Sequence, residues 1–333
     1  MRMALISLAF CLAACSLAAE DGAPSDPAIE MSISPISRCI NLGSALEASY
    51  EGEWGYTVRQ EDLVRIRDAG FDTVRLPVRW SVHTQETAPY RIRAAKLDRV
   101  REIVDWAEAL DLNIIINVHH YDALNWDADT HEPRLEAIWD QLATAFAGAT
   151  EKVIFETLNE PHAEMTQART DALNKRILSR IRRDDPDRWV ILGTANWGNL
   201  DALAQSRPDY DPRAILTTHI YSPFEFTHQG APWAAAKRTG VTWGSAADLR
   251  AMRADLDAAS EVQTRQRMPV FVGEFGVYEA VPVAERARWT RFVRTEMEAR
   301  DLSWCYWDFA GSLKAFDTEA EAWIPEIKAA LLD

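Results

Sequence analysis

The stretches V-I-F-E-T-L-N-E-P at residues 153–161 and P-V-F-V-G-E-F-G at residues 269–276 decide the fold. Each begins with a short run of β-branched and aromatic residues, which is typical of a buried parallel strand and too short for a helix. Each then carries a glutamate, Glu160 or Glu274, where the strand should end. If both strands run the same way in one barrel, the two carboxylates face each other across its mouth, as breaking a glycosidic bond requires.

Strand and helix patterns alternate along the chain around these two stretches. Eight strands are expected, at residues 38–42, 73–78, 113–118, 153–158, 189–192, 215–218, 270–272 and 304–307. Helices are expected at 61–69, 94–110, 135–147, 168–183, 199–205, 247–267, 283–300 and 319–332. This alternation predicts an α/β protein, a single (β/α)8 TIM barrel over residues 37–333. A doubly wound open sheet is the alternative, but no glycine-rich dinucleotide fingerprint follows the first strand.

Composition narrows the range of partners. The 333 residues include 36 Lys and Arg against 51 Asp and Glu, which gives a formal net charge of −15. Such a surface repels phosphate backbones, so nucleic acid is not an expected partner. No cofactor motif is visible, and we expect a monomer that uses no cofactor.

The amino terminus has the pattern of an export signal. A short basic start precedes an apolar run, which predicts a signal peptide over residues 1–19 and a flexible tether over 20–36. Two interpretations remain open: lipidation of Cys15 in a lipoprotein-like L-A-A-C, or ordinary cleavage near residues 18–19. The protein is expected to be exported, whether periplasmic, anchored to the outer membrane through a lipid, or extracellular. No later segment is long and apolar enough to span a bilayer.

Two cysteines, Cys39 and Cys305, remain in the expected domain. They fall in the first and last predicted strands, which are neighbours in a closed barrel. A disulfide is open to them in an oxidising compartment, but two buried free thiols are favoured.

Polar and aromatic side chains end several of the predicted strands. For each glutamate taken alone, the alternative is that it only solvates a strand end, and for Arg75 the alternative is that it only closes a buried ion pair. Packing around Glu274 by small and aromatic residues should raise a carboxyl pKa. The pair His119 and His120 raises the alternative of a metal site. We disfavour it because adjacent side chains on a strand point to opposite faces and no further ligands accompany them at metal-binding spacing.

Tryptophan is abundant, with 13 copies, and its flat apolar face suits sugar C–H groups. Core packing accounts for most of them. The candidates for a sugar-lined cleft lie in loops or near strand ends: Trp54, Trp126, Trp197, Trp233, Trp243 and Trp307.

Taken together, these residues resemble glycoside hydrolase family 5, the cellulase family with a (β/α)8 barrel and a retaining mechanism. The resemblance covers the chain after the tether. It rests on Arg75 in V-R-L-P-V, His119 in N-V-H-H-Y, N-E-P at 159–161, His219 and Tyr221 in H-I-Y, Glu274 in G-E-F-G, and Trp307 in Y-W-D. The stretches N-L-G-S-A-L-E at 41–47 and 221–231 further resemble the bacterial endoglucanase branch, some of whose members cleave mannan. Members of that branch often have Asn where this chain has Ser44.

The resemblance implies a role for each matching residue. Glu160 would be the acid/base and Glu274 the nucleophile, with no metal. Asn159 would hold the sugar 2-hydroxyl, Arg75 and Tyr221 would hydrogen-bond Glu274, and His219 would tune Glu160. His119 and His120 would contact sugar hydroxyls, and Trp307 would lie beneath the sugar. Apart from the resemblance, Glu47, Trp126 and Trp233 lie in predicted loops and are candidates to line outer subsites.

The leading hypothesis is therefore an exported retaining endo-β-1,4-glucanase acting on β-glucan. A β-mannanase, an exo-β-glucosidase and a β-1,3-glucanase are alternatives on the same site, because outer loops set the substrate. A carbohydrate-binding protein without catalysis is the alternative from another class. It has no need for an acid and nucleophile pair.

Overall fold

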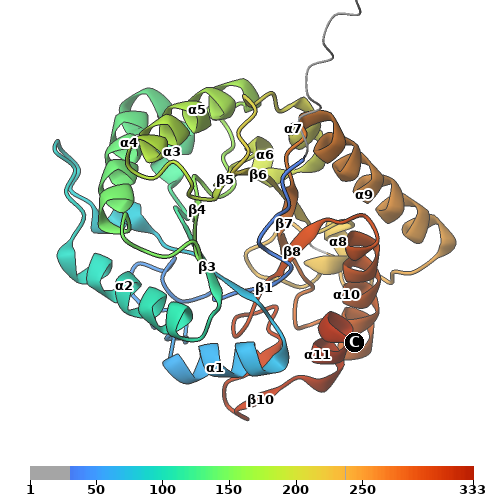
Figure 1. Cartoon of the computed structure of the whole chain (residues 1–333). Coiled ribbons are helices and arrows are strands. Elements are labelled where there is room, and N and C mark those ends of the chain that lie inside the picture. The colour runs from blue at the N-terminus through green and yellow to red at the C-terminus, as the bar shows by residue number, and fades with distance from the viewer. Residues whose placement is uncertain (1–30, 237) are drawn as a thin grey trace, which may run out of the picture. The chain divides into compact units, whose positions relative to one another are not determined.

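The computed structural model describes residues 31–236 and 238–333, and the unit Met31–Asp333 contains the barrel. Eight parallel strands close in sequence order from β1 to β8, with β8 paired back to β1 (Figure 1). The strands are β1 (Arg38–Asn41), β2 (Thr73–Leu76), β3 (Asn113–Asn117), β4 (Val153–Glu156), β5 (Val190–Leu192), β6 (Ala214–Ile220), β7 (Val270–Phe275) and β8 (Ser303–Tyr306). The predicted (β/α)8 barrel is confirmed.

Helices surround the strands (Figure 1). The longer ones are α1 (Gln60–Ala69), α2 (Ala94–Ala109), α4 (Ala128–Ala145), α5 (Gln167–Asp184), α7 (Leu200–Gln205), α9 (Ala246–Gln266), α10 (Val283–Glu298) and α11 (Pro325–Leu332). The helix expected from residue 319 is wrong at its start, because β9 (Phe316–Asp317) and β10 (Ala322–Trp323) pair there as a hairpin. Pro325 then begins α11, since proline fits the first helical turn, where its missing N–H is not needed.

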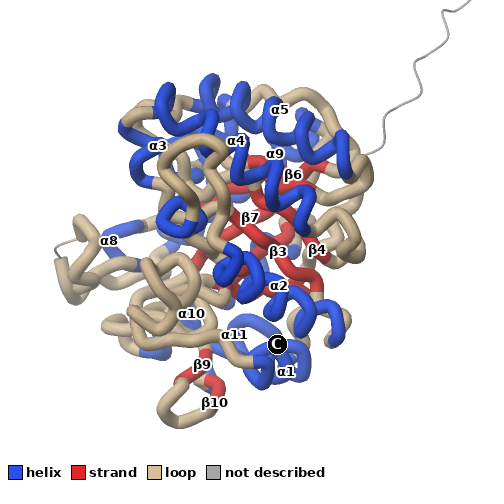
Figure 2. The backbone as a smooth tube through the Cα atoms, turned by 90° about the vertical axis from the view of Figure 1, so that its left-hand side faces the viewer, coloured by secondary structure: helices blue, strands red, loops and turns tan. Residues whose placement is uncertain are grey.

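Short helices that the sequence did not indicate lie in the loops after the strands. They are η1 (Trp80–His83), α3 (Asp122–Trp126), α6 (Ala195–Gly198) and α8 (Phe224–Thr227). Figure 2 shows α3 and α8 on its left-hand side, at the end of the barrel where the strands finish. The carboxyl ends of the strands and these loops therefore form the end of the barrel where a site is expected.

The barrel interior is layered. One layer of strand residues forms a separate apolar cluster. Its members are Cys39, Ile115, Ile154, Ile191, Ile215, Phe271 and Cys305, together with Ile36 and Trp189. Because side chains alternate along a strand, residues two positions further on share this inward orientation. They are polar at Asn41, Asn117 and Glu156, and all three are fully buried. A polar layer thus lies above an apolar one, toward the carboxyl ends of the strands.

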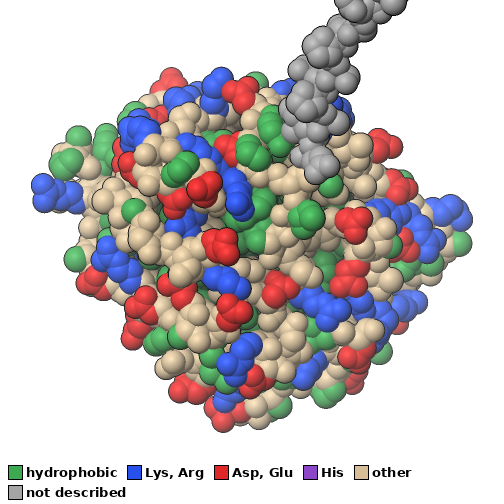
Figure 3. Space-filling model, viewed as in Figure 1, with side chains coloured by type: hydrophobic (Ala, Val, Ile, Leu, Met, Phe, Trp, Pro, Cys, Tyr) green, Lys and Arg blue, Asp and Glu red, His purple; other side chains and the backbone are tan. Residues whose placement is uncertain are grey.

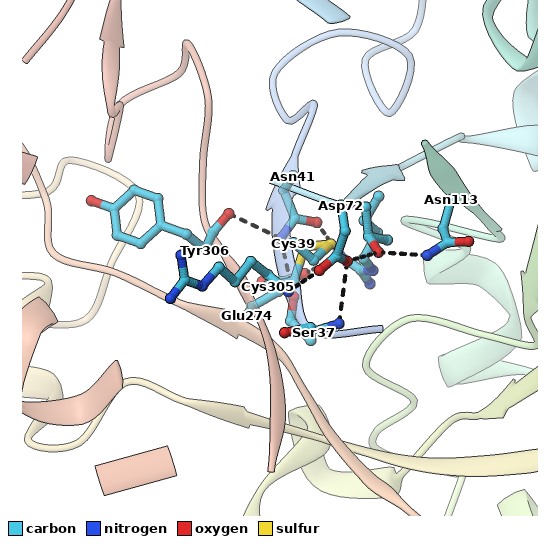
Figure 4. Close-up of a disulfide and its surroundings, with 12 residues drawn as sticks. Ser37, Cys39, Asn41, Asp72, Asn113, Glu274, Cys305 and Tyr306 are labelled. Carbon is cyan, nitrogen blue, oxygen red and sulfur yellow. Dashed lines mark hydrogen bonds and ion pairs between the residues drawn. A yellow bond between two sulfur atoms is a disulfide. The ribbon is translucent and has the colours of Figure 1, made fainter. Parts of the chain in front are cut away.

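Cys39 and Cys305 form a disulfide, so the expectation of two free thiols is wrong. They are directly opposite in the β1–β8 register, and their Cα atoms are 4.1 Å apart. Figure 4 shows the disulfide with Asn41 close by, and Asn41 donates to the Gly273 and Tyr306 carbonyls. A covalent bond therefore joins the first and last strands where the barrel closes.

Residues just before the expected boundary at residue 37 also pack against the barrel. Ile36 is buried in the inner cluster, and the Pro35 carbonyl accepts from the Asn113 side chain at 3.0 Å. The predicted signal peptide, the Cys15 lipidation site and the tether up to residue 30 lie outside the described residues. Within the part of the chain from residue 31 on, no helix has the length and apolar character needed to cross a bilayer. On the face in Figure 3, acidic and basic side chains are interspersed.

Candidate active site

Glu274 lies near the end of β7, and its carboxylate is held by two donors. Arg75 Nη1 donates to Oε1 at 2.8 Å, and the Tyr221 hydroxyl donates to Oε2 at 3.0 Å. The ladders to β6 and β8 lose their regular register beside Glu274. Gly273 is needed there, because a Cβ atom would lie only 3.0 Å from Thr217 Oγ1 and 3.1 Å from His219 Nε2. The backbone before Glu274 therefore packs closely against side chains of β6.

Glu160 follows β4 and has a left-handed backbone, with φ of 46°. This conformation is uncommon for a residue other than glycine and persists where surrounding contacts hold it. His219, from β6, places Nδ1 2.8 Å from Glu160 Oε1 and 3.6 Å from Glu274 Oε2. The Glu160 side chain is 27% exposed, whereas that of Glu274 is 7% exposed. Glu160 is therefore the carboxyl more open to a ligand.

The two carboxyl groups are close together. One oxygen of each, with a ring nitrogen of His219, lies within 4.8 Å of the others. Three such atoms could in geometry hold a metal ion. Arg75, however, already places a cation against Glu274, which disfavours a second positive charge there. The arrangement suits one carboxyl group that transfers a proton to a ligand and a second that forms a bond to the same ligand.

Arg75 is fully buried, and its guanidinium contacts both Glu156 and Glu274. It forms an ion pair with Glu156 through Nε at 2.6 Å and Nη2 at 2.8 Å, and it also contacts Glu274. Its remaining hydrogen bonds go to Asn41 Oδ1 at 2.8 Å and Asn159 Oδ1 at 2.7 Å. The two alternatives considered for Arg75, a structural ion pair and a partner of Glu274, are therefore both present in the structure.

Sequence reasoning missed Glu156 and Asn41. Strand alternation could have found them, because each lies two residues beyond an inward apolar residue, Ile154 or Cys39. Their positions inside the strands made them look like ordinary core positions. His162 was also missed, and its Nδ1 lies 2.9 Å from the Glu160 carbonyl oxygen.

The charges around His219 set the direction of the pKa shifts. Burial lowers the pKa of His219, but the Glu274 and Glu160 carboxylates outweigh burial and raise it above its usual value. Burial raises the pKa of Glu160, yet the hydrogen bond and charge of His219 prevail and lower it. Burial raises the pKa of Glu274, and His219 and Arg75 only partly oppose that. The directions of these shifts favour a proton on His219 over one on Glu160, and the two groups are 2.8 Å apart.

His119 and His120 lie together rather than on opposite faces. Their ring centroids are 4.4 Å apart, so the argument from strand alternation is wrong. β3 ends at Asn117, and His120 has a left-handed φ of 49°, so the alternation of a strand no longer applies. The His119 ring stacks on Trp307, with centroids 5.7 Å apart and planes 10° apart. Asn117 fixes His119 through a contact of 3.2 Å to Nδ1.

Several tryptophans are exposed in the loops. Trp54, Trp126, Trp197 and Trp233 are each at least half exposed. Trp197 follows β5, and its ring stacks on His162 with centroids 4.5 Å apart. Trp126 meets the same imidazole edge-on at 6.1 Å, so the pair forms an aromatic surface beside Glu160. Trp243 is 3% exposed and packs against Trp289 and Phe292, so its predicted place in the cleft is wrong.

The sequence profile of the family described as "Cellulase (glycosyl hydrolase family 5)" matches residues 41–312. The chain belongs to glycosyl hydrolase family 5. Its match to Endoglucanase H of Acetivibrio thermocellus is 36% identical over 268 residues, which is 80% of this chain and 29% of that protein. Endoglucanase A of Clostridium longisporum is 29% identical, with 80% of this chain and 57% of that protein covered. This family 5 chain thus spans less than two thirds of these curated relatives.

Solved structures of family 5 proteins superpose on the chain. Cel5A of Thermotoga maritima, described in complex with cellobiose, is 37% identical with a TM-score of 0.87, covering 89% of this chain and 97% of that one. The same Thermotoga maritima protein is also described with a mannotriose substrate, with the same identity, coverage and TM-score.

Glu47 does not line a subsite in this family 5 chain. It is 1% exposed, and its carboxylate accepts from the backbone N–H groups of Ser44 and Ala45. It therefore supports the loop after β1 from inside. Asp308, after β8, is fully buried nearby, and its Oδ1 has no hydrogen-bond partner among the described residues. Burial raises the pKa of Glu47 to about 7, with a smaller contribution from the charge of Glu274. Burial, together with the charge of Glu47, raises the pKa of Asp308 to about 7.

We expect Asp308→Asn to stabilise the protein more at pH 8 than at pH 5. The folded pKa of Asp308 is above its ordinary value, so the stability tied to its neutral form is lost as pH rises from about 4 through about 7. Asn carries no charge, and the gain at pH 8 over pH 5 should be about 1 kcal/mol or more. Urea unfolding at both pH values measures it. Asp187→Asn, at an exposed position, is the control. A gain that is equal at both pH values would contradict the buried charge.

Proposed function

We propose that the protein is a retaining β-glycan hydrolase, most specifically an endo-β-1,4-glucanase. One observation carries the proposal: two carboxyl groups with oxygens within 4.8 Å, one held by Arg75 and Tyr221 and the other by His219. Retaining glycosidases place their two carboxyl groups about 5–5.5 Å apart, whereas inverting enzymes need about 6.5–9.5 Å to admit a water. A binding protein without catalysis would not need this pair.

In the first step, Glu274 attacks the anomeric carbon while Glu160 gives a proton to the departing glycosidic oxygen. Arg75 and Tyr221 hold the Glu274 carboxylate by both oxygens, which orients it and favours its ionised form. Glu160 can draw its proton from His219 across the 2.8 Å contact. In the second step Glu160 takes a proton from water, which attacks the anomeric carbon and releases Glu274.

Asn159 is proposed to bind the sugar 2-hydroxyl, because Arg75 fixes its side-chain oxygen beside Glu274. His119 and His120 would contact hydroxyls of the sugar at the cleavage site, and Trp307, held against His119, would lie beneath that sugar. The Trp197 and Trp126 surface lies on the Glu160 side, so it would receive the sugar that leaves. Trp233, which contacts Tyr278 edge-on, is proposed for an outer subsite.

The pH dependence follows from where the proton is held. Protonation of Glu274, whose pKa is raised, would stop attack at low pH. Loss of the proton from His219, whose pKa is also raised, would stop proton delivery at high pH. We therefore expect a bell-shaped kcat/KM profile with an alkaline limb above the usual range of histidine.

β-1,4-Glucan is the proposed substrate because the matched relatives are named endoglucanases. β-Mannan is the second candidate, since a structural relative is described with both cellobiose and mannotriose. A product profile on soluble cellulose, mannan, lichenan and laminarin tests this. Short oligosaccharides from cellulose, with little release from laminarin, are expected. Glucose released alone from chain ends would favour an exo-β-glucosidase instead, and activity on laminarin alone a β-1,3-glucanase.

Export is proposed from the apolar leader at residues 1–19, with Cys15 as the candidate lipid attachment site. Intact-mass analysis of the mature protein tests both interpretations. An acylated Cys15 terminus would mean a membrane anchor, whereas an unmodified chain beginning near Glu20 would mean release into the periplasm or medium.

A further inference from the structure

A pocket of about 520 Å³ lies beside the candidate active site, between η1, the loop that follows it and the start of α3. His120 and Tyr121 form the wall nearest the catalytic groups. The His120 ring is 4.4 Å from that of His119, and the charge of Glu160 acts on His120. A volume of several hundred Å³ is typical of a ligand site. A sugar lying against His120 could therefore extend a substituent into this pocket.

Three arginines line the pocket, although the chain carries a net charge of −15: Arg79, Arg93 and Arg134. Among residues 31–236 and 238–333, Arg93 and Arg134 form no ion pair. Arg79 pairs with Asp122 at 3.2 Å, but the Asp122 side chain is 62% exposed. Glu86, which is exposed, is the other acidic residue in the lining. The pocket lining therefore has three arginines and two acidic residues.

Arg134 has no acidic partner among the described residues, and its guanidinium lies over the Tyr121 ring, 5.7 Å from the centroid. Arg134 is 7% exposed, and one of its terminal nitrogens donates to the Ser81 and Thr84 carbonyls. Its Nε–H is buried without an acceptor in the described part of the chain, and the same is true of Arg79 Nε. A buried guanidinium without a counter-charge is costly, and a buried donor without an acceptor adds to that cost. A planar carboxylate would relieve both, because its two oxygens match the guanidinium fork.

We infer that this pocket receives a carboxylate carried as a substituent on the sugar that lies against His120, so that the enzyme favours acidic β-glycans over neutral ones. The inference rests on the proposed function and adds a substrate class to it. The carboxylate could belong to a uronic acid branch or to a short carboxyalkyl ether, since both present the same group. The arginines act in binding only, and no covalent step involves them.

The test compares a charged and a neutral polymer with the same backbone. We expect wild-type kcat/KM on carboxymethyl-cellulose to fall about tenfold in Arg79→Gln/Arg93→Gln, while kcat/KM on hydroxyethyl-cellulose stays unchanged, because charge-assisted hydrogen bonds are lost. Arg250→Gln removes one positive charge from an exposed site on α9 and should change neither value. An equal change on both polymers, or the same selective loss in Arg250→Gln, would overturn the inference.

A binding measurement separates this inference from the proposed hydrolysis. Calorimetry on Glu160→Gln would compare an oligosaccharide bearing one glucuronic acid branch with its carboxyl-reduced counterpart. Tighter binding of the acid, lost in Arg79→Gln/Arg93→Gln, supports the pocket even if no polymer is cleaved. Equal affinity for the two sugars, together with no preference for carboxymethyl-cellulose, contradicts it. A preference for the acidic ligand in only one of the two comparisons also supports the pocket. It shows whether the pocket takes the carboxylate of a uronic acid or that of an ether.

Discussion

Replacing Glu274 with Gln should reduce turnover by several orders of magnitude while leaving the fold intact. Gln keeps the shape that accepts from Arg75 and Tyr221, but its amide cannot attack the anomeric carbon. Glu160→Gln should cause a loss of similar size on polysaccharide, because the leaving oxygen then receives no proton. Initial rates on soluble cellulose, with circular dichroism to check folding, measure both effects.

The two glutamates should differ when a small nucleophile is supplied. In Glu274→Ala, azide can occupy the space of the lost carboxylate and attack an activated aryl glycoside once, giving an inverted product. Glu279→Gln, a change at a glutamate in the loop after β7, is a matched control that should retain wild-type turnover. Wild-type rates in either purified active-site variant would refute the assignment of these residues.

Arg75→Met should lower both stability and activity. Removing the guanidinium leaves Glu156 buried without a counter-charge, and breaking a buried pair in this way costs about 3–5 kcal/mol. Glu274 also loses one of its two donors, so kcat should fall by about 100-fold or more. Urea unfolding and steady-state kinetics on the same preparation measure the two losses.

A second variant separates the structural effect from the chemical one. Arg75→Met/Glu156→Met removes both members of the ion pair and fills their space with apolar side chains, so much of the lost stability should return. Activity should stay low, because Glu274 still lacks Arg75. If activity returned together with stability, Arg75 would act only through the fold.

The sequence predicted the barrel because each strand is a compact run of buried residues between helical patterns. It placed the proposed catalytic pair for the same reason: parallel strands bring Glu160 and Glu274 to one end. Predicted element boundaries are wrong where a local residue preference, such as that of proline, outweighs the hydrophobic periodicity. The hairpin before Pro325 is an example, because the residues from 319 read as helical until the proline is given its place at a helix start.

What the sequence could not predict depends on contacts between distant segments. Trp243 and Glu47 lie in loops, and only the packing of the folded chain shows that both are buried. The His119 and His120 geometry depends on a left-handed backbone at His120 that no residue pattern indicated. The Cys39–Cys305 bond required the register between the first and last strands, which closure of the barrel sets.

The stereochemistry of the first product tests the central claim most directly. If Glu274 forms a bond to the anomeric carbon and water later displaces it, each step inverts and the two together retain configuration. Proton magnetic resonance during the first minutes of cellulose oligosaccharide hydrolysis should therefore detect the β-anomer first, followed by slow mutarotation. An initial α-anomer would mean that water attacks the sugar directly, which contradicts the close pair of carboxyl groups as nucleophile and acid/base.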